Sequence, residues 1–530
     1  MASCYEDKGN YDYIDLPDMT IKLPVAQYNI PAGSKLIIEP EIVTTLPENE
    51  LDYRWEIYSQ FEEEDVVYSE LFAQFHTLNN ESSDPKRLEY TCVIDGQYIQ
   101  KLTSYRIRLH VVHTPTQRDF YSNQSTLAVG GKAGLMVIHD NGSTSDIGLV
   151  VASEFMRTAG QTPEVEVTAD FYSSINGARL QGKGVMLYHA NPVVETELRR
   201  TYFVAITDQV GEFVAIDFAK YQDWDFLFYG GLHKRKGNSK PEGIVYTGMQ
   251  KCYFDGGEVY VQSGDFATFP VISEKYATYS KFDVAPFFVF GNYKLWLFDR
   301  KARGFLSTLI GMVSDNSVFG PAPVNTSGGL FNLYDMQADL LWMDNGGAAS
   351  HILAVMQKDD KERFLVEINA ADAVVANQAY ARYDDVSMLP GFNQAVAYAF
   401  GYDQVNMCYY AAPNQVYRYT VFNRAISGVE PLCMTDGSPL KLDDGTPVDF
   451  SSTEVTCCRL LKPFDTLGLG TILGVANYFN YNKLLVVGTF SGGKGTVYSM
   501  AIDQMTGRVT KVNKYEGNFG YIRDVNIKFM

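Results

Sequence analysis

One short pattern recurs through residues 129–530 and restricts the fold more than any other feature of the sequence. An apolar run ends in Asp or Asn, a few polar or glycine residues follow, and a second apolar run begins. The Asp and Asn residues of the pattern occupy positions 140, 208, 255, 299, 369, 423 and 503. Asp and Asn hydrogen-bond their own backbone and tolerate positive φ, and glycine adopts it freely, so each instance predicts a β-hairpin. Seven hairpins, each with room for two more strands, predict a seven-bladed β-propeller. Between the hairpins, only residues 371–381 have a helical pattern.

The last residues of the chain indicate how such a ring closes. Residues 521–529 alternate between apolar and polar side chains, as a strand with one buried face does. We expect this strand to pair with strands from near residue 134 within one blade. Pairing of the first and last segments removes exposed strand edges that otherwise promote aggregation.

The residues before the propeller predict a separate small domain. Residues 1–20 are polar and predict a flexible tether. Residues 21–128 alternate with a period of two: Tyr53, Trp55 and Ile57 share one face of a strand, and Arg54 and Glu56 share the other. About 100 residues of such strands predict a β-sandwich of the immunoglobulin type, with Trp55 in its core. We therefore expect a tether over 1–20, a sandwich over 21–128 and a propeller over 129–530.

Composition and charge limit the partners. The net charge of −19 opposes binding to nucleic acid, which is attracted by Lys and Arg. We interpret the one basic loop, residues 233–236 with Lys240, as a solvated loop tip. The seven cysteines form no CxxC pair, so they predict buried free thiols rather than a zinc ribbon. No run of 18 apolar residues occurs, so no membrane-spanning helix is predicted.

Motifs of catalysis are missing from the sequence, which contains neither HExxH nor GxSxG. His139–Thr144 and Asp344–Gly346 resemble parts of the Asp-box of sialidase-like propellers, but hairpin turns explain them better. Trp224 and Trp342 stand near Asp residues, as in glycan or peptide sites, although a core role between blades is the simpler interpretation. We therefore predict no catalytic residue and leave the ligand-binding residues open.

No metal site or cofactor is predicted either. The acidic run 62–65 is interpreted as a solvated connection between strands. Calcium at the acidic loop of Asp436, Asp443, Asp444 and Asp449 is the one alternative, but the spacing does not match an EF-hand.

The two ends of the chain carry a family resemblance. Met1-Ala2-Ser3-Cys4 resembles the tail of a bacterial lipobox, whose apolar stretch we expect upstream of the printed sequence. Residues 4–13, CYEDKGNYDY, resemble the mature N-terminus of the PKD-like lipoproteins of Bacteroidota, and residues 524–528 resemble the C-terminus of that family. The resemblance implies a PKD-like sandwich, a lipid on Cys4, and Glu6 and Asp7 as the signal for export to the extracellular face of the outer membrane.

The same resemblance implies a role in nutrient uptake. Members of this family are similar to accessory proteins of SusC/SusD-type TonB-dependent importers, with oligopeptide favoured over glycan as cargo. We therefore predict a non-enzymatic, lipid-anchored accessory subunit. Two alternatives stay open: a propeller hydrolase, either glycosidase or peptidase, and a stand-alone surface protein that binds glycan or peptide.

Overall fold

The computed structural model describes residues 18–31, 35–59, 75–92, 104–130, 132–156, 163–189, 202–215, 217–225, 239–246, 251–262, 274–275, 282–287, 289–291, 294–309, 320–321, 331–346, 351–369, 379–401, 406–462, 478 and 480–528. Within these ranges strands are the main regular structure, and α1 (Phe171–Asn176) is the single α-helix. No helix there is long and apolar enough to cross a membrane. The all-β prediction is confirmed.

The chain divides into two compact units. The first comprises Met1–Gly131 with Met530, and the second comprises Lys132–Phe529. The division falls close to the expected boundary between residues 128 and 129. Each unit is described by itself below.

The first unit contains three sheets among its described residues. Two are antiparallel pairs, β1 (Met19–Lys22) with β4 (Glu41–Thr44) and β3 (Lys35–Ile38) with β7 (Leu88–Thr91). The third has the order β2 (Gln27–Pro31), β10 (Ser125–Gly130), β8 (Ser104–His113), β5 (Leu51–Ser59) and β6 (His76–Thr77), and β9 (Arg118–Tyr121) also pairs with β8. The β2–β10 pair is parallel, and the other pairs are antiparallel.

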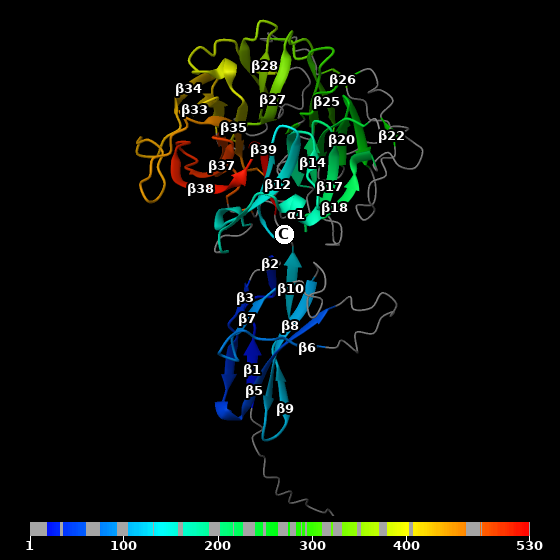
Figure 1. Ribbon diagram of the computed structural model, residues 1–530, viewed down its shortest axis with the longest axis vertical. Coiled ribbons are helices and arrows are strands. Elements are labelled where there is room, and N and C mark those ends of the chain that lie inside the picture. The colour runs from blue at the N-terminus through cyan, green and yellow to red at the C-terminus, as the bar shows by residue number, and fades with distance from the viewer. Residues whose placement is uncertain are drawn as a thin grey trace, which may run out of the picture. The chain divides into compact units, whose positions relative to one another are not determined.

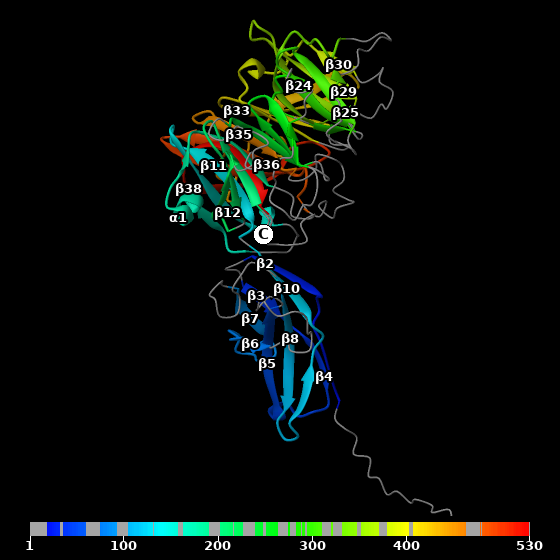
Figure 2. The ribbon, with the colours of Figure 1, turned by 90° about the vertical axis from the view of Figure 1, so that its right-hand side faces the viewer.

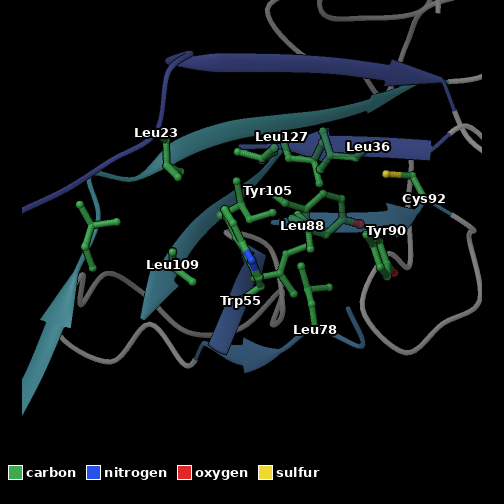
Figure 3. Packing of buried hydrophobic residues seen from close by; sticks show 14 of the residues in the cluster. Leu23, Leu36, Trp55, Leu78, Leu88, Tyr90, Cys92, Tyr105, Leu109 and Leu127 are labelled. Carbon is green, nitrogen blue, oxygen red and sulfur yellow. The ribbon is translucent and has the colours of Figure 1, made fainter. Parts of the chain in front are cut away.

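The core of the first unit follows the predicted alternation. Trp55 and Ile57 are 2% and 1% exposed, and Figure 3 shows Trp55 among Leu78, Leu88, Leu109 and Tyr105. Cys92 lies in the same core as a free thiol, and burial raises its pKa to about 12, so the expected inert thiol is observed there.

One residue of the polar face of β5 differs from a simple solvated pattern. Glu56 is only 9% exposed because Arg108 and His110 cover it: its carboxylate oxygens lie 2.7 Å from Arg108 Nε and 2.8 Å from His110 Nδ1. The charge of Glu56 is thus tolerated at low exposure by pairing.

The second unit contains seven antiparallel sheets among its described residues, one with five strands and six with four. The first four, given from the first strand to the fourth, are as follows: β39 (Tyr521–Lys528), β11 (Gly134–Asp140), β12 (Thr144–Val151), β13 (Glu166–Thr168); β15 (Gly184–His189), β16 (Tyr202–Thr207), β17 (Gly211–Ala215), β18 (Lys220–Asp223); β19 (Pro241–Tyr246), β20 (Lys251–Asp255), β21 (Glu258–Gln262), β22 (Glu274–Lys275); β23 (Val289–Gly291), β24 (Lys294–Asp299), β25 (Gly304–Leu309), β26 (Gly320–Pro321). A short strand, β14 (Leu180–Gln181), also pairs with β12.

The other three sheets continue in chain order: β27 (Asp339–Asn345), β28 (His351–Gln357), β29 (Arg363–Asn369), β30 (Ala379–Tyr383); β31 (Ala397–Phe400), β32 (Met407–Ala412), β33 (Gln415–Phe422), β34 (Ala425–Pro431); β35 (Glu454–Leu460), β36 (Leu484–Ser491), β37 (Lys494–Ile502), β38 (Val509–Phe519). Of the segment 371–381 that had a helical pattern, residues 379–381 belong to strand β30, so the helical prediction is wrong there. The rest of that segment lies outside the described residues.

The predicted closing pair is confirmed. Strand β39 pairs antiparallel with β11, with Gly134 opposite Lys528 and Val137 opposite Val525. Both views show the red last strand beside the cyan strands that begin this unit (Figures 1 and 2). Segments nearly 400 residues apart therefore share one sheet.

Six of the seven pattern positions mark turns between consecutive antiparallel strands, whereas 369 ends strand β29 and the residues after it lie outside the described ranges. The positions do not mark the same connection in every sheet. Positions 140, 208, 255 and 299 lie between the second and third strands, whereas 369, 423 and 503 lie between the third and fourth. In the last three sheets the turn between the second and third strands uses other turn-forming residues, such as Gly492 and Gly493, both at positive φ. Turn chemistry marks where a strand ends and carries no information on its number within the sheet.

Three of these aspartates have a second role that explains why the residue is Asp. Asp208 Oδ1 accepts the backbone N–H of Lys183 at 2.7 Å, and Asp255 Oδ2 accepts that of Lys240 at 3.0 Å. Asp299 Oδ1 accepts the N–H of residue 283 at 2.9 Å in the same way. In each case the aspartate ends the second strand and holds the segment that leads into the first strand of its own sheet.

Candidate functional site

A cavity of about 350 Å³ lies where the first strands of the seven sheets come together. Its wall includes Val185, Met186 and Tyr188 of β15, Glu242 of β19, Pro286 and Phe287 just before β23, Trp342–Asp344 of β27, Val396–Ala399 at β31, Thr456–Lys462 at β35, and Arg523, Asp524 and Asn526 of β39. Every sheet of the second unit therefore contributes to one cavity. Its volume is at the lower end of the roughly 300–1,000 Å³ typical of small-molecule sites.

The charged residues of the wall are paired. Lys462 Nζ lies 2.7 Å from Asp344 Oδ2 and also donates to a backbone carbonyl. Arg459 Nη1 lies 2.5 Å from Asp524 Oδ1. Burial lowers the pKa of Arg459, but the neighbouring Asp524 carboxylate, together with Cys457 and Asp344, raises it by more, so the net shift is upward and the guanidinium keeps its charge.

The three carboxylates of the wall use all their oxygens within the protein. Asp344 Oδ1 accepts the N–H of Asn345 at 2.8 Å, and Asp524 Oδ2 accepts the N–H of Leu187 at 2.9 Å. Glu242 accepts from the Gly257 N–H at 2.7 Å with one oxygen and from Arg300 with the other. These acids hold the strands in place, and their geometry is that of structural groups.

Aromatic rings line another part of the wall. Phe287 and Trp342 meet edge to face with ring centroids 5.6 Å apart, and Trp342 lies 6.5 Å from the ring of Tyr398. Of the two tryptophans noted in the sequence, Trp224 is 2% exposed and donates from Nε1 to Asp255 at 2.9 Å, as a core residue does. Trp342 is only partly buried and belongs to the cavity wall, so the core interpretation is incomplete for it.

The Asp-box-like segments have structural roles. His139 Nε2 lies 3.0 Å from the carbonyl oxygen of Ala169, and Gly520 N–H donates to its Nδ1. Asp140 is 1% exposed and lies 2.5 Å from Arg523 Nε, and it also accepts the N–H of Gly142 in the predicted turn. The hairpin interpretation of this segment is confirmed, and Asp344 of the second segment lies in the cavity wall.

The acidic loop considered for calcium forms turns instead. Asp436, Asp444 and Asp449 each accept a backbone N–H two residues further on. Hydrogen bonds from Ser438 lower the pKa of Asp436. Within the part of the chain that the structure describes, no three His, Cys, Asp or Glu side chains gather as a metal site would require.

Several predictions fall on residues that are not described. Cys4, Glu6 and Asp7 lie outside the described residues, as do the acidic run 62–65 and the basic loop 233–236. The lipid anchor and the export signal therefore stay predictions from the sequence.

Sequence reasoning missed Arg459, Lys462 and Arg523 as residues of one site. The available signal was weak: Arg459 follows two buried cysteines and precedes two buried leucines, and a charge inside such a run is costly unless it is paired.

A second buried cluster was also missed. Glu367 is 3% exposed and receives the hydroxyl of Tyr383 at 2.7 Å, and its other oxygen lies 2.7 Å from His351 Nδ1.

Comparison with known proteins places the first part of the chain. Residues 4–184 match the model of the PKD-like family. This range covers the first unit and the beginning of the second. No curated protein sequence matches the chain significantly.

Similar solved structures cover much of the chain at low identity. The crystal structure of Hsv2 from Kluyveromyces marxianus is 7% identical, with 74% of this chain and 94% of that chain covered and a TM-score of 0.34. The extracellular domain of the putative hybrid two-component system BT4673 from B. thetaiotaomicron is 10% identical, with 77% and 44% covered and a TM-score of 0.23. PorZ of Porphyromonas gingivalis, a surface component of the type-IX secretion system, is 10% identical, with 79% and 53% covered and a TM-score of 0.20. At these scores no property of those proteins is transferred to this chain.

Proposed function

We propose that the second unit is a seven-bladed β-propeller and that the chain is a non-enzymatic, lipid-anchored binding protein at the bacterial cell surface. The observation that carries the proposal is the cavity to which all seven sheets contribute. Loops and strand ends on a rigid β scaffold are common places for binding.

The proposed ring is supported by a cyclic series of side-chain interactions between successive sheets. In order around the ring they are Leu187 with Asp524, Trp224 with Asp255, Arg300 with Glu242, Arg303 with Asp339, Arg363 with Tyr398, Arg508 with Glu430, and Arg459 with Asp524. The series ends on the sheet where it began, because Asp524 of β39 contacts both the second sheet and the seventh. A closed ring of seven blades explains this better than an open stack.

The state of the wall carboxylates supports binding over hydrolysis. A glycosidase needs two carboxyl groups that reach the scissile bond, one of them as a proton donor. Asp344, Asp524 and Glu242 instead accept hydrogen bonds from the protein on both oxygens. A screen of the chain on glycans and peptides tests this: turnover that disappears on a single carboxylate-to-amide change would establish a hydrolase.

The anchor is proposed from the first residues of the chain and from the PKD-like match over residues 4–184. Cys4 carries the lipid, and Glu6 and Asp7 direct export to the extracellular face of the outer membrane. Expression of the full precursor with labelled palmitate, beside Cys4→Ser, tests the first point. Protease accessibility on intact cells, beside a variant with Glu6 and Asp7 changed to Ser, tests the second.

We place this protein beside a SusC/SusD-type TonB-dependent importer, as an accessory subunit that helps to capture or present oligopeptide or glycan cargo. Copurification of the tagged chain with an importer pair from native outer membranes is the expected result. A chain that purifies alone from several mild detergents, yet binds cargo in calorimetry, would instead be a stand-alone surface binder.

A further inference from the structure

Among the charged side chains of the cavity wall, two arginines leave hydrogen-bond donors unused. Each oxygen of the three wall carboxylates already accepts a bond from the protein, as shown above. The guanidinium groups of Arg459 and Arg523 do not use all of their donors. An arginine has five N–H donors and no acceptor, so unused guanidinium edges favour an anionic, acceptor-rich group.

Arg459 belongs to the cavity wall and uses one nitrogen of its guanidinium for the hydrogen bonds that the structure describes. Its Nη1 donates to Asp524 Oδ1 at 2.5 Å and to the carbonyl of Val525 at 3.0 Å, while Nε and Nη2 have no hydrogen-bond partner among the described residues. Neither of these two nitrogens is fully buried. The Arg459 side chain is 30% exposed, although it lies on β35, the first strand of its sheet, in the cavity wall. The two nitrogens are therefore open to a ligand.

Arg523 offers a second edge from the neighbouring strand β39. Its Nε lies 2.5 Å from Asp140 Oδ2, and this contact fixes the side chain. The central carbon of the guanidinium, Cζ, lies 4.1 Å from the centroid of the Tyr521 ring. Within the part of the chain that the structure describes, neither Nη atom has a hydrogen-bond partner, and the side chain is 32% exposed. Buried Asp140 thus orients an arginine that belongs to the cavity wall and keeps its Nη groups for further hydrogen bonds.

The rest of the wall is suited to an apolar body. Phe287, Trp342 and Tyr398 form the aromatic part described above. Val185 and Val396 line the same cavity and are 48% and 49% exposed, so apolar side chains are also accessible there. Accessible valines beside aromatic rings favour a ligand with apolar surface.

We propose that this cavity binds a small ligand that carries a carboxylate on an apolar or ring-shaped body. The carboxylate pairs with Arg459 and Arg523, and the body packs on the aromatic part. A peptide C-terminus and an acidic sugar share this chemistry. The inference rests on the proposed binding function and names the class of ligand.

The negative net charge of the chain does not oppose this assignment at close range. Charges farther away than the Debye length, about 8 Å at physiological ionic strength, are largely screened, whereas an arginine in contact with the ligand is not. The net charge of −19 therefore acts on the approach of an anion, and the wall arginines act on its bound state.

Isothermal titration calorimetry of the full chain tests the class with four probes: the dipeptide Ala-Phe, its C-terminal amide, galacturonate and galactose. We expect at least one carboxylate probe to bind about tenfold to a hundredfold more tightly than its neutral counterpart, as loss of a charge-assisted hydrogen bond predicts. Tighter binding of Ala-Phe identifies a peptide terminus, and tighter binding of galacturonate identifies an acidic sugar. Equal binding within each pair, or no binding of either acid, overturns the inference.

Variants assign the binding to the cavity. Arg459→Gln and Arg523→Gln are each expected to weaken the acid probe about tenfold or more, whereas Arg382→Gln, which removes an arginine paired with Asp384 elsewhere, leaves it unchanged. Loss in the Arg382 variant, or none in the others, contradicts the assignment.

A second approach leaves both arginines in place. Val396→Trp narrows the cavity at an accessible position and is expected to abolish binding, while Val165→Trp, at a 61% exposed position outside the wall, does not. Binding that survives Val396→Trp places the ligand elsewhere. Copurification with an importer does not require the cavity, so a chain that copurifies but binds no acid would refute this inference alone.

Discussion

Glu154 provides a direct test of how the first and last sheets of the second unit hold together. It lies in η3 (Ser153–Phe155), which follows β12, and its Oε1 accepts hydrogen bonds from Ser499 Oγ at 2.8 Å, Asn513 Nδ2 at 2.7 Å and the hydroxyl of Tyr515. All three donors belong to the seventh sheet. Removing the carboxylate leaves all three without this acceptor.

The magnitude follows from these contacts. A hydrogen bond to a charged group contributes about 1.5–3 kcal/mol, and three donors that share one oxygen are not additive, so we expect Glu154→Ala to cost about 3 kcal/mol. Unfolding entropy is about 2.1 cal/mol/K per residue, or roughly 0.8 kcal/mol/K for a unit of about 400 residues. The melting temperature of the second unit should therefore fall by about 4 °C.

Differential scanning calorimetry measures this shift, with Glu164→Ala as the matched control. Glu164 is an exposed glutamate nearby in the chain, and its removal should change the melting temperature little. Glu154→Gln keeps an acceptor oxygen and should fall between the two. A Glu154→Ala variant that melts with the control would refute the idea that this carboxylate joins the two sheets.

Three further substitutions test side chains of the second unit. Burial lowers the pKa of Lys528 to about 7, below its unfolded value of about 10.4, so between these values the unfolded chain binds more protons and stability rises with pH. Urea unfolding at pH 7 and pH 9.5 should show a rise of about 3 kcal/mol, and Lys528→Met should abolish it. Hydrogen bonds from Arg508 and then Arg418 lower the pKa of Glu430 to about 2, so its contribution is present above about pH 4.5 and is lost as the pH falls through 2; acid unfolding of Glu430→Gln should begin at higher pH than that of the native chain. Trp224→Phe removes the indole donor from Oδ2 of buried Asp255, which still accepts the N–H of Lys240, and should cost about 1 kcal/mol in chemical unfolding; an unchanged midpoint would argue against that bond.

The closing strand shows how far the sequence could be followed. Its alternating side chains predicted a strand, and the need to cover strand edges predicted its pairing with the residues near 134, which is observed. The same reasoning failed to number the hairpins, since turn residues such as Asn423 and Gly493 look alike whichever two strands they join.

The sequence by itself determined the features that depend on neighbours within a few residues. Period-two alternation gave the β-strands and the inward face of Trp55, and the Asp, Asn and Gly positions gave the turns. The cavity required the tertiary structure, because its wall combines residues from Val185 to Asn526 that no local pattern relates. Whether Arg459 forms an ion pair in the core or keeps free donors depends on how β39, which lies far away in the sequence, packs against its guanidinium. Only the packing between sheets determines this arrangement.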